Sequence, residues 1–209
     1  MAYSYLDYQT EGATYVLAPS DPEALAIAGS GLNAAVNKLN GFNWSCMIQS
    51  SGITFVAGQT DYTIPSGVRA PRALRIEEDS RIGFLDRETF NTELPEYQAT
   101  GDPKRYTYIN TFGAQKIRLS NAPSAAWVTS HASATFEYYA RIPNLSGNTE
   151  TLSVPPEFEE VIMDFVRLFS AQRNDGDNLV RYKAARSDYQ EGLQRLYTNE
   201  MNDQTTDQE

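Results

Sequence analysis

The chain has 209 residues, a formal net charge of -10 and a pI near 4.6, which argue against a protein that grips nucleic-acid phosphates through a basic face. Hydrophobic residues make up 41% and charged residues 21%, so we expect one compact, mostly ordered subunit. The single cysteine excludes an intrachain disulfide and predicts synthesis in a reducing cytoplasm. No segment resembles a signal peptide or an apolar membrane span, so we expect neither signal-directed export nor membrane insertion.

Residues 1–20 are rich in tyrosine and lack a clear hydrophobic period, which predicts an extended N-terminal arm. Ser20 or Asp21 can cap a helix that begins at Pro22, and Glu23 is placed to complete a capping box. An apolar stripe at helical spacing continues to Asn40, so we expect one helix over residues 22–40. The sequence GSG inside this helix predicts a kink or a close contact with another helix.

The residue pattern changes between residues 42 and 154, where short runs of β-branched and aromatic residues alternate with turns containing Gly, Pro, Asp and Ser. The runs are residues 53–56, 62–64, 73–76, 106–109, 116–119 and 134–139. This pattern predicts an antiparallel β sandwich or barrel inserted into a helical domain. The fold class is therefore expected to be α+β.

Two more helices are expected in the C-terminal part, and their apolar stripes predict a helical hairpin. The first stripe is Phe158, Val161, Ile162, Phe165, Leu168 and Phe169, and the second is Leu179, Tyr182, Ala185, Tyr189, Leu193 and Leu196. Residues 199–209 contain four acidic residues and no basic residue, which is typical of a flexible tail. The expected organisation is an arm (1–20), a helical domain (21–41 and 155–198), a β domain (42–154) and this tail.

Residues suited to catalysis or to metal and cofactor binding are scarce. His131 is the only histidine, and its serine-rich surroundings are more typical of a solvent-facing loop than of a Ser-His pair. Cys46 follows Trp44 among apolar residues, so we expect an inert cysteine in or near the core. One cysteine and one histidine cannot form the usual structural zinc site. We expect no catalytic residue, no metal site and no cofactor.

Two acidic features have alternative interpretations. Residues 174–178, NDGDN, are similar to a calcium loop, but Arg186 stands where an EF-hand needs glutamate, so a turn is expected. Carboxylate pairs such as Glu157 with Glu160 are compatible with glycoside hydrolysis, but solvated helix starts have the same composition. Nine of the 17 basic residues lie between Arg69 and Arg118, an asymmetry that favours complementary faces on neighbouring copies.

Several short motifs, in this order, resemble the head-to-tail adaptor proteins of tailed phages, including the tail tubular protein A type. They are LNAAVNKLNGFNW (32–44), FVAGQTDYTIP (55–65), GDPKRY (101–106), EYYARIP (137–143) and VPPEF (154–158). The resemblance implies a structural virion protein of the phage neck, made in the host cytoplasm. It also implies a ring of about twelve copies that docks on the portal protein and connects it to a tail or nozzle protein, with DNA passing through its channel unbound.

The resemblance also implies that the C-terminal segment reaches the portal and that the β part faces the tail. The residues expected to bind the portal are Tyr197, Asn199, Met201, Asn202, Asp203 and Gln204. Those expected to contact the tail side or a neighbouring subunit are Tyr3, Tyr5, Tyr8, Arg81 and Phe84. Other readings stay open at this point: a stopper, a tail terminator, a baseplate part, or a glycan-binding tail module suggested by Trp44, Trp127 and the tyrosines.

Overall fold

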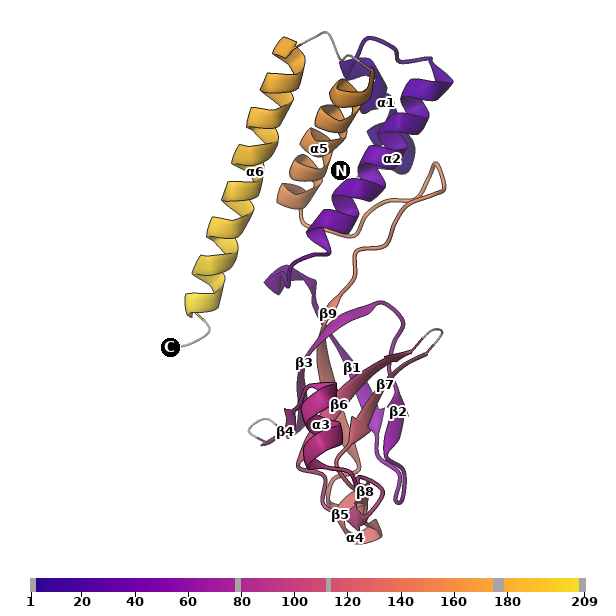
Figure 1. Cartoon of the computed structure of the whole chain (residues 1–209), viewed down its shortest axis with the longest axis vertical. Helices are drawn as coiled ribbons and strands as arrows, with labels where there is room; N and C mark the ends of the chain where they lie inside the picture. The colour runs from indigo at the N-terminus through magenta and orange to yellow at the C-terminus, as the bar shows by residue number, and fades with distance from the viewer. Residues whose placement is uncertain (1–2, 78–79, 112–113, 175–178, 207–209) are drawn as a thin grey trace. The chain divides into compact units, whose positions relative to one another are not determined.

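The computed structural model describes residues 3–77, 80–111, 114–174 and 179–206 (Figure 1). Over these residues the chain forms two compact units, and the chain enters the second unit from the first and returns to it. The helical unit comprises residues 1–47 and 142–209, and the β unit comprises residues 48–141. Helices and a curled sheet in one chain confirm the predicted α+β class.

Four long helices and one short 3-10 turn form the helical unit. They are α1 (Tyr5–Tyr15), α2 (Pro22–Leu39), η1 (Ser45–Met47), α5 (Pro156–Asn174) and α6 (Leu179–Thr206). The predicted helix over residues 22–40 is confirmed, with Pro22 in its first turn. Its cap differs in detail, because the Asp21 side chain accepts a hydrogen bond from the backbone N–H of Glu23 and no reciprocal box is formed there.

Helix α1 overturns the prediction of an extended N-terminal arm. Ser4 caps this helix, and its hydroxyl and the Asp7 carboxylate form a capping box. Gly12 lies where α1 meets α2 and α5, since a Cβ atom there would come within 2.7 Å of the Ala28 Cβ and 2.8 Å of Ser170 Oγ. Only glycine lets the three helices approach this closely, so α1 is part of the core of this unit.

The predicted hairpin of α5 and α6 is confirmed by their side-by-side packing (Figure 1). The first stripe is largely buried on α5, whereas α6 buries a narrower seam than expected. Gly192, rather than Leu193, lies in that seam, and a Cβ there would come within 2.8 Å of Val161 Cγ2. Helix α6 also continues to Thr206, so residues 199–206 extend the helix instead of starting a separate tail.

Asn33 of α2 and Asn40, the residue after this helix, bind the chain where it returns from the β unit. The Asn40 side chain donates to the Ile142 carbonyl at 2.9 Å and accepts from the Ile142 N–H at 2.8 Å. Asn33 makes the same pair of bonds with Leu145, at 3.2 and 3.1 Å. An amide that both donates and accepts satisfies an irregular backbone as a neighbouring strand would.

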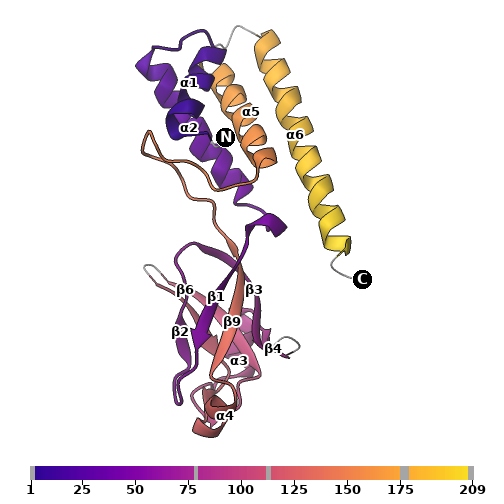
Figure 2. The same cartoon turned by 180° about the vertical axis from the view of Figure 1, so that it is seen from behind.

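The β unit contains one curled seven-stranded sheet in the order β1-β9-β3-β4-β6-β7-β2 (Figure 2). Its strands are β1 (Ile48–Thr54), β2 (Asp61–Thr63), β3 (Val68–Glu77), β4 (Ser80–Phe84), β6 (Arg105–Thr111), β7 (Ala114–Leu119) and β9 (Ser133–Ala140). Alternate residues of β9, including Phe136, point into a core shared with Leu74, Tyr106 and Ile117. Most strand pairs are antiparallel as predicted, but β4 and β6 pair in parallel.

Short elements fill the connections of the β unit. They are α3 (Arg87–Glu93), the bridge-like strands β5 (Thr100–Gly101) and β8 (Ala122–Pro123), and α4 (Ala125–Ser130). Asp86 caps α3 and Ser124 caps α4 through side-chain oxygens. The sequence interpretation missed β4, α3 and α4, because each is too short for its hydrophobic period to be recognised.

Candidate functional site

An aromatic cluster closes one end of the helical unit. Trp44 is only 3% exposed, and its indole N–H donates to the Leu39 carbonyl at 2.9 Å. Its ring lies 5.1 Å from Phe158 at the start of α5 and 5.4 Å from Tyr197 on α6, measured between ring centroids. Phe42 packs edge-on against Tyr197 at 5.1 Å and is 47% exposed. The cluster therefore joins α5, α6 and the segment after α2, and it leaves an apolar ring at the surface.

The Glu200 carboxylate ties the same end of α6 to the turn that follows this segment. It accepts the Ser45 N–H at 2.9 Å and the Ser45 hydroxyl at 3.0 Å. Ser45 begins the 3-10 turn η1, so the carboxylate occupies the place of a capping side chain at the start of that turn. Cys46, in the same turn, is exposed, which corrects the expectation of a core cysteine.

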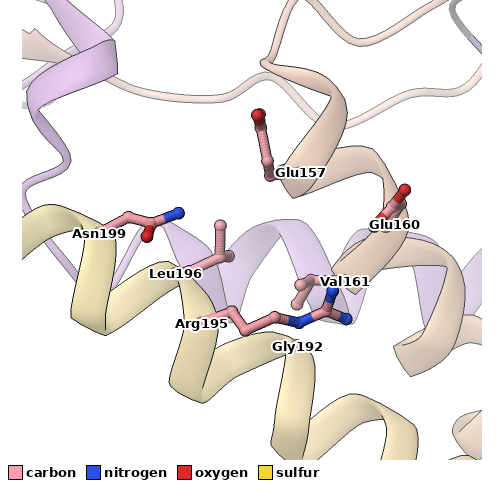
Figure 3. Close-up of a pocket in the computed structure, with 7 residues that line it drawn as sticks. All are labelled: Glu157, Glu160, Val161, Gly192, Arg195, Leu196 and Asn199. Atoms are coloured by element: carbon pink, nitrogen blue, oxygen red, sulfur yellow. The ribbon is translucent and has the colours of Figure 1, made fainter.

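A groove of about 160 Å³ runs beside the α5–α6 seam (Figure 3). Its lining residues are Glu157, Glu160, Val161, Gly192, Arg195, Leu196 and Asn199. Carboxylates from α5 stand on one side of the groove, and Arg195 and Asn199 from α6 stand on the other. These side chains are carboxylates, a guanidinium, an amide and apolar groups, so the groove offers ionic and hydrogen-bonding contacts to another molecule.

The acidic face continues along α5. Asp164 is half-buried, and desolvation raises the pKa of its carboxyl, with Asp188 and Glu160 adding to the increase. Arg167 opposes this by an ion pair with Asp164 at 3.2 Å, and it also donates to Glu11 of α1 at 2.7 Å. Arg167 therefore connects α5 to α1 through its ion pairs with Asp164 and Glu11.

The residues predicted to bind the portal lie in the C-terminal part of α6, whose course Figure 1 shows. Tyr197 is half-buried in the aromatic cluster, Asn199 is exposed beside the groove, and Met201 is 70% exposed. Asn202, Asp203 and Gln204 belong to the α6 backbone, while their side chains lie outside the described residues. The helix thus brings the described members of this set to one end of the unit.

The tyrosines predicted to contact a neighbour from the N-terminus fall into different environments. Tyr3 is 44% exposed, with its ring 5.6 Å from that of Tyr8. Tyr5 is half-buried, and its hydroxyl lies against Gly29 of α2. Tyr8 is fully buried, and burial strongly raises the pKa of its hydroxyl. Tyr8 is therefore a core residue and is removed from the predicted contact set.

The remaining predicted contacts lie on β4 of the β unit. Arg81 is exposed on this strand. Phe84 is 48% exposed, although its ring packs against Tyr106 at 5.5 Å. A large apolar ring that keeps half of its surface in solvent is typical of protein contact surfaces.

The other residues considered for chemistry are accounted for by structural contacts. His131 caps the C-terminus of α4 and lies 5.0 Å from the Trp127 ring. Within the described residues no group of three His, Cys, Asp or Glu side chains is placed to hold a metal ion. Residues 175–178 of the calcium-like turn lie outside the described residues. In the part of the chain that the structure describes, no helix has the length and apolar character needed to cross a membrane.

Comparisons with known proteins found matches to a protein family and to solved structures. No curated protein has a significant sequence similarity to the chain. A solved structure described as "Neck of native GTA particle computed with C12 symmetry" is similar over 84% of this chain and 82% of that chain, with 13% identity and a TM-score of 0.26. The sequence matches the family of the SU10 adaptor protein over residues 3–208. Because this match spans nearly the whole chain, the chain belongs to the SU10 adaptor protein family and is a structural phage adaptor.

Proposed function

We propose that the chain forms a ring in the virion neck, docks on the portal and connects it to a tail or nozzle protein, with DNA passing through the channel. The observation that carries the proposal is the family match over residues 3–208. Twelve copies are expected in the ring, as the adaptor resemblance implies. The helical hairpin, the β unit and the exposed end of α6 provide separate surfaces for the neighbours that such a subunit needs.

The distribution of charge supports contacts between copies of the chain and disfavours binding to DNA. The helical unit has 17 acidic and 7 basic residues, a net charge of -10, whereas the β unit has 10 of each and no net charge. A head-to-tail ring joins two different surfaces of each copy, and pairing an acidic surface with a neutral, mixed one avoids the like-charge repulsion between two acidic surfaces. Negative charge on the helical unit also repels phosphates, which suits DNA that slides past the protein.

The end of α6 is the proposed portal contact. It consists of Tyr197, Asn199 and Met201, continued by Asn202, Asp203 and Gln204. The exposed Met201 offers a flexible apolar side chain, and the acidic residues after it favour a partner surface with basic side chains. Tyr3, Tyr5, Arg81 and Phe84 are the proposed contacts to the tail or to a neighbouring subunit.

Native mass spectrometry of the protein, alone and mixed with the portal protein of the same particle, tests the proposal. We expect a monomer alone and about twelve copies on the portal, as in a closed symmetric ring. A subunit that never associates with the portal would contradict the proposal and favour a tail or fibre part, for which glycan binding is the next assay.

Deletion of residues 202–209 locates the contact. This truncation keeps Glu200 and its bonds to Ser45, so we expect an unchanged midpoint of thermal unfolding and at least about tenfold weaker binding to the portal. The matched control replaces the exposed Gln190, on the same helix but three turns earlier, with alanine and is expected to bind normally. Equal affinities of the truncated and intact proteins would move the portal contact elsewhere.

A further inference from the structure

The end of α6 is bound to the segment through which the chain leaves the helical unit. Tyr197 packs on Phe42 and Trp44, and Glu200 accepts two hydrogen bonds from Ser45. We call these five residues the clasp. Met47 ends this segment, and the chain continues directly into β1. We propose that the clasp is closed in the free subunit and opens when a partner takes up the end of α6, which releases residues 42–47.

The clasp is an important attachment for α6 at this end. Elsewhere the helix fully buries Ala185, Gly192 and Leu196 and partly buries Tyr189, whose ring lies 5.0 Å from that of Phe165. Ala185 and Gly192 remove little apolar area from water, so the clasp adds substantially to the attachment of this end of the helix. The aromatic rings and the capping carboxylate are directional contacts that a small displacement of the helix disrupts.

The position of the clasp makes it sensitive to binding. Glu200 is adjacent to Met201, and Tyr197 is itself one of the residues assigned to the portal contact, so this inference rests on the proposed function. One residue of helix rise is about 1.5 Å, and a shift of that size breaks hydrogen bonds of 2.9 Å. A partner that turns or pulls the helix end therefore removes the cap of η1.

Hydrogen exchange in the free protein tests whether the clasp protects residues 42–47. Glu200→Ala removes the capping carboxylate and is expected to speed exchange of the amides of residues 45–47 by a factor of about ten. The matched control is Glu191→Ala, which removes an exposed carboxylate from the same helix outside the clasp and is expected to leave those amides unchanged. Equal exchange in the two variants would refute the clasp.

Exchange in the presence of the portal protein of the same particle tests the opening. We expect portal binding to speed exchange at residues 45–47 in the wild type. Glu200→Ala is expected to bind the portal more tightly by the factor gained in exchange, because coupling between two equilibria is reciprocal. Ser45→Ala weakens the clasp from the side that is not on α6, so a smaller gain in affinity is expected there as well.

Two results would overturn the inference, and they differ in what they say of the proposed function. Normal portal binding with unchanged or slower exchange at residues 45–47 would refute the opening and leave the adaptor function standing. Absence of portal binding by the wild-type protein would refute both.

Discussion

Substitution of Gly12 by alanine tests whether the N-terminal segment is part of the core. The added Cβ atom would lie 2.7 Å from the Ala28 Cβ, 2.8 Å from Ser170 Oγ and 2.8 Å from Val166 Cγ1. Overpacking of this kind costs about 1–3 kcal/mol for a single crowded site. The three contacts come from two other helices and include a Cβ that cannot rotate away, so we expect a cost at the upper end of that range.

The higher helix propensity of alanine offsets part of this loss of stability. Alanine is favoured over glycine in a helix interior by about 1 kcal/mol. The expected result is therefore a net loss of about 2 kcal/mol in the free energy of unfolding of the helical unit. An extended arm would instead show no loss, so the sign of the change separates the two structures of residues 5–15.

Urea unfolding of a Trp127→Phe background, followed by the fluorescence of Trp44, reports the helical unit alone, since Trp44 belongs to that unit and Trp127 to the β unit. Gly52→Ala, in the β unit, where no atom lies within 4 Å of a Cβ, checks that this readout does not respond to a glycine substitution outside the helical unit. We expect the control to be neutral. A Gly12→Ala protein as stable as the wild type would refute the packing of α1 against α2 and α5.

Two further predictions concern the cores of the two units. Phe165→Ala should destabilise the helical unit by about 3–5 kcal/mol in thermal or urea unfolding, because it leaves a cavity in the core. It also removes a ring whose centroid lies 5.0 Å from that of Tyr189 and 4.6 Å from the Lys38 ammonium. A near-neutral result would mean that the ring faces a partner instead. In the β unit, the hydrogen-bonded Arg118 guanidinium lowers the pKa of Asp61 below its ordinary value of 3.8, so this pair contributes stability above that pH and loses it as the pH falls through the folded-state value. Asp61→Asn should therefore lose less stability than the wild type on acidification below pH 3.8, and parallel pH profiles would contradict this.

The sequence alone determined the long, strongly periodic helices and the α+β class. Pro22 after Asp21 marks a helix start by chemistry that acts within one turn, and the stripe through Phe158 and Phe165 has a period that only a helix satisfies. The strand signal in residues 42–154 also comes from neighbouring residues, because runs of β-branched and aromatic residues between turn residues favour strands wherever they pair. These signals need no knowledge of distant neighbours.

The candidate site was predictable only in outline. The acidic, polar character of residues 199–209 indicated a flexible tail, and the resemblance to phage adaptors implied that this segment binds a partner. The contact that holds this end of α6 joins Glu200 to Ser45, 155 positions earlier in the chain. Sequence spacing gives no signal for a pair so far apart.

The tertiary structure alone decided that residues 5–15 form a helix and that β4 pairs with β6. Residues 5–15 have weak helical periodicity because Gly12 and Ala13 are buried for their small size, not their hydrophobicity. The close approach of α2 and α5 stabilises this helix, and such packing routinely overrides weak local preference. Strand order likewise depends on which edges meet in space, a choice that residues far apart in the chain make together.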